Sequence, residues 1–318
     1  MGLSIDKILV PTDFSECARA ALDQAVSLAR QHRAELHFLH VMMSHDEDPY
    51  SLVYQVSDRN EVYRQQQELC AAQLERILGR QPTEGLRAEQ HLRRAFSVAP
   101  AILDFAAEEG IDFLVMGAHG RRGWRRFLLG SVAEEVVRLA PCPVLTVRQD
   151  SRPLDFTHLG RIAVPIDFSE HSRAALRTAK ELATGDSELE LLHVVQLPLF
   201  PHYYDVLHDP AQEYAFPQIA LKVEEAMGRF IDRTGGPEVS CRLRVLEGEV
   251  AASITDYAAS SDVDLIVIAT HGLSGLQHLL LGSVAEKVVR SSVRPVLTVK
   301  GAWGLGEDGE VPDQAPPG

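Results

Sequence analysis

The chain has 318 residues, of which 45% are hydrophobic and 24% charged, and its formal net charge is −14 at pH 7. This composition is typical of a globular protein, and the length predicts two domains of about 150 residues rather than one core. The acidic balance disfavours nucleic acid and anionic membranes as partners, because both select for clustered Lys and Arg.

The sequence also lacks signals for export or membrane insertion. No apolar run approaches the roughly 18 residues of a membrane span, and "MGLSIDKILVP" does not have the pattern of a secretory signal. The four cysteines, Cys17, Cys70, Cys142 and Cys241, form no C-x-x-C pair, which favours reduced thiols. We therefore expect a cytoplasmic protein that binds neither membranes nor nucleic acid.

Short apolar runs alternate with helical patterns along the first half of the chain. The expected strands are "KILVP" (7–11), "LHFLHV" (36–41), "RAEQHLR" (87–93), "DFLVMG" (112–117) and "PVLTV" (143–147). The expected helices are 16–32, a longer one within 60–78, 98–109 and 131–140, with Ser15 as an N-cap of the first. Near-continuous apolar strands between helices predict a doubly wound, five-stranded parallel sheet of the Rossmann-like α/β class.

The second half of the chain repeats the first. "KILVPTDFSECARAAL" at Lys7 returns as "RIAVPIDFSEHSRAAL" at Arg161, and "ELHFLHVM" returns as "ELELLHVV". "GAHGRRGWRRFLLGSVAEEVVRLAPCPVLTVR" returns as "ATHGLSGLQHLLLGSVAEKVVRSSVRPVLTVK". A period near 150 residues indicates a duplicated domain. We expect a first repeat at 1–148, a linker at 149–160, a second repeat at 161–300 and a disordered tail at 301–318.

The stretch "GAHGRRGWRRFLLGS" combines glycines with four arginines between an expected strand and an expected helix. Its spacing is Gly117-x2-Gly120-x9-Gly130-Ser131. Bare backbone N–H groups and the helix dipole at such a turn favour an anion such as a phosphate. A G-x-x-x-x-G-K-[ST] motif is absent, so phosphoryl transfer of the P-loop kind is not supported.

These segments together resemble the universal stress protein family. "VPTDFS", "LHV", "VMGAHG", "LLGSVAEEVV" and "PVLTV" occur in the order found in the family, over nearly all of both repeats. The resemblance implies that ATP or a related adenine nucleotide binds, with its phosphates at the two glycine turns, its ribose at Asp13 and its adenine near Val41. It also implies that the two domains meet through their last strands.

The resemblance and the spacing together give two sets of candidate nucleotide-binding residues. The first set is Pro11, Thr12, Asp13, Val41, Met116, Gly117, His119, Gly120, Arg121, Gly130, Ser131 and Val132. The second and weaker set is Pro165, Asp167, Val194, Ala269, His271, Gly272, Gly282, Ser283 and Val284. The resemblance implies the strand order 3-2-1-4-5, and with that order the residues that follow the first and fourth strands flank the crevice where ligands bind in a doubly wound sheet.

Structural roles compete with these assignments. Asp13 and Asp167 could cap the first helix of each repeat or order its turn, and Ser131 and Ser283 could be N-caps. Arg121, Arg122, Arg125 and Arg126 could be a solvated loop face. His119 and His271 are better explained as turn-packing residues than as catalytic bases.

The histidines of the second strand do not indicate a metal site. His37 and His40 are three residues apart, so on a strand they point to opposite faces and cannot chelate one ion. We therefore expect no resident metal, and a Mg²⁺ requirement for the nucleotide stays open.

The repeats differ where the phosphates are expected. The second has Ala269 in place of Gly117, and "LSGLQHLLL" in place of "RRGWRRFLL", so the four arginines are lost. The first has Phe96 in place of Gly248, which puts close packing near the following helix in doubt. We expect the first repeat to be the stronger site, because a methyl group would oppose a positive φ at that turn and the cations are gone.

The sequence thus predicts a tandem universal stress protein that is a nucleotide-responsive regulator in stress survival. It predicts no enzymatic activity beyond very slow ATP hydrolysis. A slow nucleotide hydrolase and a scaffold that has lost nucleotide binding stay open as alternatives, as does further self-association such as a homodimer.

Overall fold

A computed structural model describes residues 5–43, 59–81, 85–120, 129–196, 210–272 and 281–300. The first repeat runs β1 (Lys7–Thr12), α1 (Glu16–His32), β2 (Glu35–Met43), α3 (Arg59–Leu78), β3 (Ala88–Ala95), α4 (Val98–Glu108), β4 (Phe113–Gly117), α5 (Ser131–Leu139) and β5 (Val144–Val147). The second runs β6 (Arg161–Pro165), α6 (Glu170–Leu182), β7 (Glu188–Val195), α7 (Pro210–Thr234), β8 (Ser240–Glu247), α8 (Val250–Ser260), β9 (Leu265–Ala269), α9 (Ser283–Ser291) and β10 (Val296–Val299). The expected tail, 301–318, lies outside the described residues.

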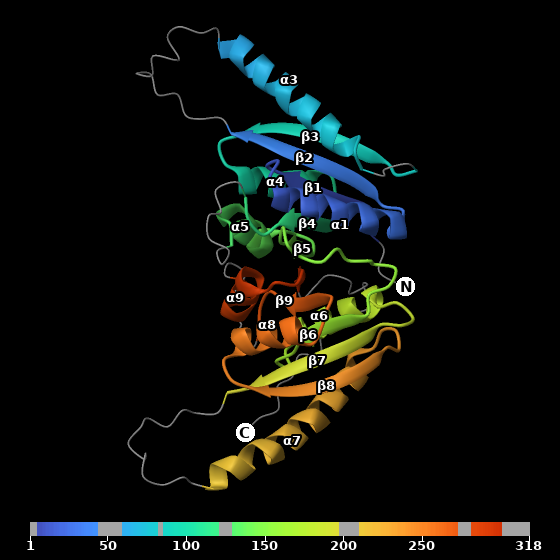
Figure 1. Cartoon of the computed structure of the whole chain (residues 1–318), viewed down its shortest axis with the longest axis vertical. Coiled ribbons are helices and arrows are strands. Elements are labelled where there is room, and N and C mark those ends of the chain that lie inside the picture. The colour runs from blue at the N-terminus through green and yellow to red at the C-terminus, as the bar shows by residue number, and fades with distance from the viewer. Residues whose placement is uncertain are drawn as a thin grey trace, which may run out of the picture.

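The strands form one continuous sheet in the order β3-β2-β1-β4-β5-β10-β9-β6-β7-β8. Pairing is parallel within each repeat, and only the central pair, β5 with β10, is antiparallel. The long helices α3 and α7 lie at opposite ends of the molecule (Figure 1). The prediction of two doubly wound, five-stranded parallel units is therefore confirmed.

The two repeats meet through their last strands, as the resemblance implied. Thr146 Oγ1 donates to the Val296 carbonyl and Thr298 Oγ1 donates to the Val144 carbonyl, each at 3.1 Å, so the contact is nearly symmetric. Arg148 breaks the symmetry. Its Nη1 donates to the Ser292 carbonyl at 3.1 Å, just beyond the end of α9, where a cation is favoured by the helix dipole.

The segment that joins the repeats is packed against the first one. Leu154, Phe156 and Leu159 are buried in the same core as residues of both repeats. Leu154 N donates to Gln24 Oε1 of α1 at 2.8 Å. Residues 149–160, which look polar in sequence, therefore help to fix the first repeat against the second.

Local sequence signals account for the start of α1. Ser15 is its N-cap and accepts from Ala18 N at 3.2 Å, as expected. Phe14, just before it, has a φ of 66°, which turns the chain sharply from β1 into the helix. The same arrangement recurs at Phe168 and Ser169 before α6. Among the described helices, none has the length and apolar character that crossing a membrane requires.

Candidate functional site

Asp13 lies at the carboxyl end of β1, and its two carboxylate oxygens face different neighbours. Oδ1 accepts from Ser15 N at 3.0 Å, so the side chain orders the turn into α1 without capping the helix itself. Oδ2 faces Gly120, where a Cβ atom would lie only 2.8 Å away. Oδ1 of Asp13 therefore has the structural role of ordering the turn before α1. Oδ2 lies beside the glycine turn that follows β4.

The two glycine turns of the motif are held side by side. Gly130 N donates to the Ala118 carbonyl at 2.9 Å, which places the start of α5 against the end of β4. Gly117 is needed for a different reason, since a Cβ atom there would lie 3.0 Å from the carbonyl carbon of Cys17 in α1. Close packing of β4 against α1 thus explains Gly117, and closeness to Asp13 explains Gly120.

The N-terminus of α5 opens beside these turns. Its N-cap is Gly130, without a side-chain cap, and Ser131 is the first helical residue. The alternative in which Ser131 is an N-cap is therefore wrong, and Gly282 replaces Ser283 in that role in the second repeat. A glycine cap has no side-chain acceptor for the first backbone N–H groups of the helix. These N–H groups can therefore donate to an external anion.

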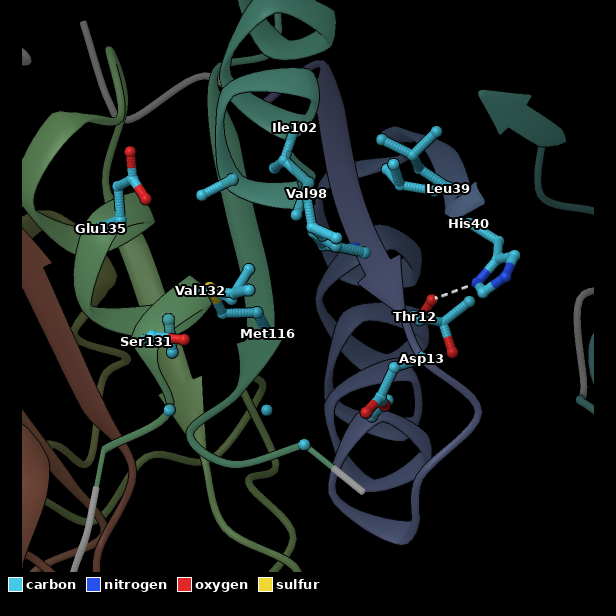
Figure 2. A pocket seen from close by; sticks show the side chains of 18 of the residues that line it. Thr12, Asp13, Leu39, His40, Val98, Ile102, Met116, Ser131, Val132 and Glu135 are labelled. Carbon is cyan, nitrogen blue, oxygen red and sulfur yellow. Dashed lines mark hydrogen bonds between the residues drawn. The ribbon is translucent and has the colours of Figure 1, made fainter. Parts of the chain in front are cut away.

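An apolar wall faces the glycine turns. Figure 2 shows Val98 and Ile102 projecting from α4, near Met116 of β4 and across from Ser131 and Val132 of α5. Val41 of β2 belongs to the same hydrophobic cluster. The site therefore has an apolar surface, formed by this wall, next to a polar surface formed by the two glycine turns.

His40 connects the ends of β1 and β2. Its Nδ1 donates to the Thr12 carbonyl at 2.7 Å, the bond drawn in Figure 2, and its ring lies 4.3 Å from the ring of Phe14. His193 makes the same bond to Ile166 at 2.9 Å in the second repeat. The histidine of each "LHV" segment therefore positions the strand ends that lead to Asp13 and Asp167.

These parts enclose a cavity of 720 Å³. All the candidates of the first set line it except Arg121, which lies outside the described residues together with Arg122, Arg125 and Arg126. Sequence reasoning missed the other residues that line the cavity: Ala18 of α1; Leu39, His40, Met42 and Met43 of β2; Phe96, Ser97, Val98, Ala99 and Ile102 at and before the start of α4; and Ala133 and Glu135 of α5. The 3.6-residue period of α4 indicated that Val98 and Ile102 share a face, but not that this face closes the cavity.

His119 lies within the first glycine turn, beside Gly130, and is partly buried. Burial and the nearby Arg148 lower its pKa, so its imidazole is neutral at pH 7. Its Nε2 is buried without a hydrogen-bond partner among the described residues. This position agrees with a packing role in the turn better than with the role of a base that contacts water.

Two segments of the chain, 4–148 and 158–300, match the model of the universal stress protein family. This chain belongs to that family. A universal stress protein of Mycolicibacterium smegmatis is 28% identical over 308 residues, which are 92% of this chain and 96% of that protein. The shorter universal stress protein YxiE of Bacillus subtilis is 35% identical over 151 residues, covering 45% of this chain and 99% of its own.

Solved universal stress proteins share the tandem fold. A putative one from Pseudomonas aeruginosa superposes with a TM-score of 0.63 at 19% identity, covering 93% of this chain and 94% of that chain. One from Archaeoglobus fulgidus gives a TM-score of 0.59 at 22% identity, covering 93% and 96%. At these identities the likeness concerns the fold alone, and it covers both repeats.

The second universal stress protein repeat reproduces the backbone of the site. Pro165 ends β6, and Asp167 Oδ1 accepts from Ser169 N at 3.0 Å. A Cβ atom at Gly272 would lie 2.4 Å from Asp167 Oδ2, and Gly282 N donates to the Thr270 carbonyl at 2.8 Å. The remaining candidates occupy the positions that correspond to those of the first repeat. Val194 lies on β7, Ala269 ends β9 and His271 follows two residues later. Ser283 and Val284 begin α9.

The reason first given for a weaker second site is wrong in one respect. Gly117 does not have a positive φ, so its replacement by Ala269 imposes no strain of that kind. The side chain of Ala269 instead joins the hydrophobic core. Near the glycine turns, the difference between the repeats that still supports a weaker second site is the loss of the four arginines.

Proposed function

We propose that the first repeat binds ATP or a related adenine nucleotide, and that binding makes the protein a regulator in stress survival. The observation that carries this proposal is that Asp13 and both glycine turns line one cavity, at the carboxyl ends of β1 and β4, with Asp13 beside Gly120 and Gly130 held against Ala118. This is the switch point of the doubly wound sheet, with β1 next to β4.

The chemistry of the cavity supports each part of the ligand. The Asp13 carboxylate can accept from both ribose hydroxyls, and the backbone N–H groups of Ser131 and Val132 in the first turn of α5 can donate to phosphate oxygens. The apolar wall that includes Val41 and Met116 suits the flat adenine ring. The second repeat, with Asp167, Ala269, Gly272 and Gly282, is proposed as a weaker site.

Calorimetry with ATP and adenosine tests the phosphate assignment. Each charge-assisted hydrogen bond contributes roughly 1.5–3 kcal/mol, so ATP should bind at least about tenfold more tightly than adenosine. Repeating the titration with EDTA shows whether Mg²⁺ takes part. Equal affinities for ATP and adenosine would remove the phosphate assignment, and failure to bind either would favour the scaffold alternative.

We further propose that hydrolysis of the nucleotide is absent or much slower than the median enzyme turnover of about 10 s⁻¹. Among the described residues that line the cavity there is no lysine to bind a γ-phosphate. Asp13 is engaged in the turn by Ser15, and the Nε2 atom of the partly buried His119 is enclosed by protein and poorly placed to orient water. Fast phosphate release that disappears in Asp13→Ala or His119→Gln would instead establish a nucleotide hydrolase.

A further inference from the structure

A cluster of three possible metal ligands lies away from the cavity, at the edge of the first sheet. His37 of β2, Glu89 and His91 of β3 each offer one ligand atom, and all three atoms lie within 4.8 Å of one another. The parallel register pairs His37 with Glu89 and Leu39 with His91, so the three side chains share the face of the sheet that α4 covers. Residues more than 50 positions apart in sequence thereby come together.

The distances suit one ion. His37 Nδ1 and His91 Nε2 are 3.1 Å apart, and His91 Nε2 is 3.7 Å from Glu89 Oε2. Two ligands of a tetrahedral Zn²⁺ at about 2.0–2.1 Å are about 3.3 Å apart, close to both separations. Glu89 is half-exposed, so rotation of its side chain can adjust the third distance.

The surroundings hold the imidazoles and leave a way in for an ion. His37 is only 2% exposed and forms the back of the cluster, while Glu89 and His91 lie toward solvent. The ring of Phe105 packs against His91 with centroids 4.7 Å apart and against His37 at 6.1 Å. One ring nitrogen of His37, Nε2, has no hydrogen-bond partner among the described residues. The protein thus satisfies only part of the bonding capacity of this buried histidine.

The charges nearby favour a cation. Glu89 and Glu109 act on His91 from β3 and from the end of α4. Arg93 is the opposing charge, but its guanidinium is paired with Glu108 and lies over the Phe105 ring, 4.7 Å from its centroid.

We propose that His37, Glu89 and His91 bind a divalent transition-metal ion of the Zn²⁺ class. Two histidines and one carboxylate provide three ligands, and water from the exposed side completes the coordination. The site is separate from the nucleotide cavity, since none of its three residues lines that cavity. The proposal departs from the expectation of no metal, because His37 faces His91 of the neighbouring strand and the expectation considered only His37 with His40.

The second repeat has other residue types at the three corresponding positions. By register, Glu190, Arg242 and Arg244 occupy the places of His37, Glu89 and His91. Arg244 Nε donates to the Tyr257 hydroxyl at 2.9 Å, and that hydroxyl donates to Glu190. Because two arginines stand where the first repeat has Glu89 and His91, only the first repeat should bind the ion.

The test uses the full chain without a histidine tag, treated with EDTA, dialysed and titrated in the absence of nucleotide. Zn²⁺ binding is followed by calorimetry, and Co²⁺ binding by its visible absorption, whose intensity reports four-coordinate geometry. We expect one site per chain, with affinity lowered roughly tenfold or more by His91→Gln and by Glu89→Gln. His158→Gln is the matched control, since exposed His158 also lies near a carboxylate, Asp155 at 3.4 Å.

Two results would overturn the proposal. One is binding no tighter than in the His91→Gln protein, and the other is an equal loss of affinity in His158→Gln. His91 and Glu89 are partly exposed, so their substitution should leave the thermal unfolding of the metal-free protein close to that of the parent. A variant that fails this check is replaced by His91→Asn, for which the same loss of Co²⁺ absorption is expected.

Discussion

The two repeats have the same backbone but fill the space beneath α4 and α8 in different ways. In the first, His37 and His91 face each other beside Phe105. In the second, the buried Glu190 accepts from Tyr257, which also accepts from Arg244. In the second repeat each polar group of the cluster bonds to another, whereas in the first the two imidazoles share one hydrogen bond and Nε2 of His37 has no partner among the described residues. The two copies of the duplicated domain thus satisfy their buried polar groups to different extents.

The mouth of the site differs as well. Gly248 has a φ of 137°, and a Cβ atom there would lie 2.8 Å from Ser253 Oγ. Phe96, at the equivalent place, does not have a positive φ, is 71% exposed and lines the cavity of the first repeat. Helix α4 still begins at Val98, so the doubt about packing there is resolved by a local change of backbone conformation. The substitution adds an aromatic ring to the rim of the first site only.

The largest effect is expected when the two aspartates are compared. Asp13→Ala should weaken ATP binding about a hundredfold, because the ribose loses two charge-assisted hydrogen bonds, while Asp167→Ala should leave the tight site nearly unchanged. Calorimetry on the two variants, with the parent as reference, measures this. The reverse result would mean that the second repeat holds the main site and that the arginines of the first serve another purpose.

Removing a hydrogen bond from the Glu190, Tyr257 and Arg244 cluster of the second repeat should destabilise the protein. Tyr257→Phe removes the hydroxyl that bonds to Glu190, which is 1% exposed, and should lower the free energy of unfolding by about 2 kcal/mol. Phe105→Tyr, the converse change in the first repeat, should cost less, because the two imidazoles can accept from the new hydroxyl. Urea denaturation of both variants measures the two changes in the free energy of unfolding. Equal decreases would show that the hydroxyl of Tyr257 stabilises the second repeat no more than a hydroxyl at Phe105 disturbs the first.

A smaller effect is expected where β4 and β9 pack on the first helix of each repeat. Gly117→Ala places a methyl group 3.0 Å from the backbone of Cys17 and should destabilise the chain by about 1 kcal/mol or slightly more. ATP affinity should change little in the variant that remains folded, because the methyl group points at α1. A large loss of affinity at unchanged stability would restore the phosphate turn as the reason for Gly117.

The smallest effect concerns pH. The histidines whose pKa is lowered by burial, His32, His91 and His119, all lie in the first repeat. Since the unfolded chain takes up protons near the ordinary value of 6.5 and the folded chain only at lower pH, stability is fully present above pH 6.5 and declines as pH falls through the folded pKa. His32→Gln should make the free energy of unfolding less dependent on pH between 7 and 5. An unchanged slope would show that burial of His32 does not contribute to acid sensitivity.

The duplication and the order of elements follow from the sequence alone, because each is encoded locally. The candidates of the first repeat, apart from Arg121, line one cavity, but the sequence did not predict the residues of α4 that line it as well. Apolar runs and helical periods predict the elements, and glycine spacing predicts a turn that opens a helix. The strand order 3-2-1-4-5 came from the resemblance, and it then placed Asp13 and Gly117 on neighbouring strands. Ser15 as an N-cap required only the residues next to it.

The tertiary structure decided what depends on contact between distant segments. Gly117 is small because α1 approaches it, Gly120 because Asp13 does, and Gly130 is the cap in place of Ser131. His37 meets His91 only through the register of β2 with β3, across 54 positions of sequence. A one-residue shift in that register would turn the side chains of β3 to the other face of the sheet, and no local pattern in the sequence fixes which register forms.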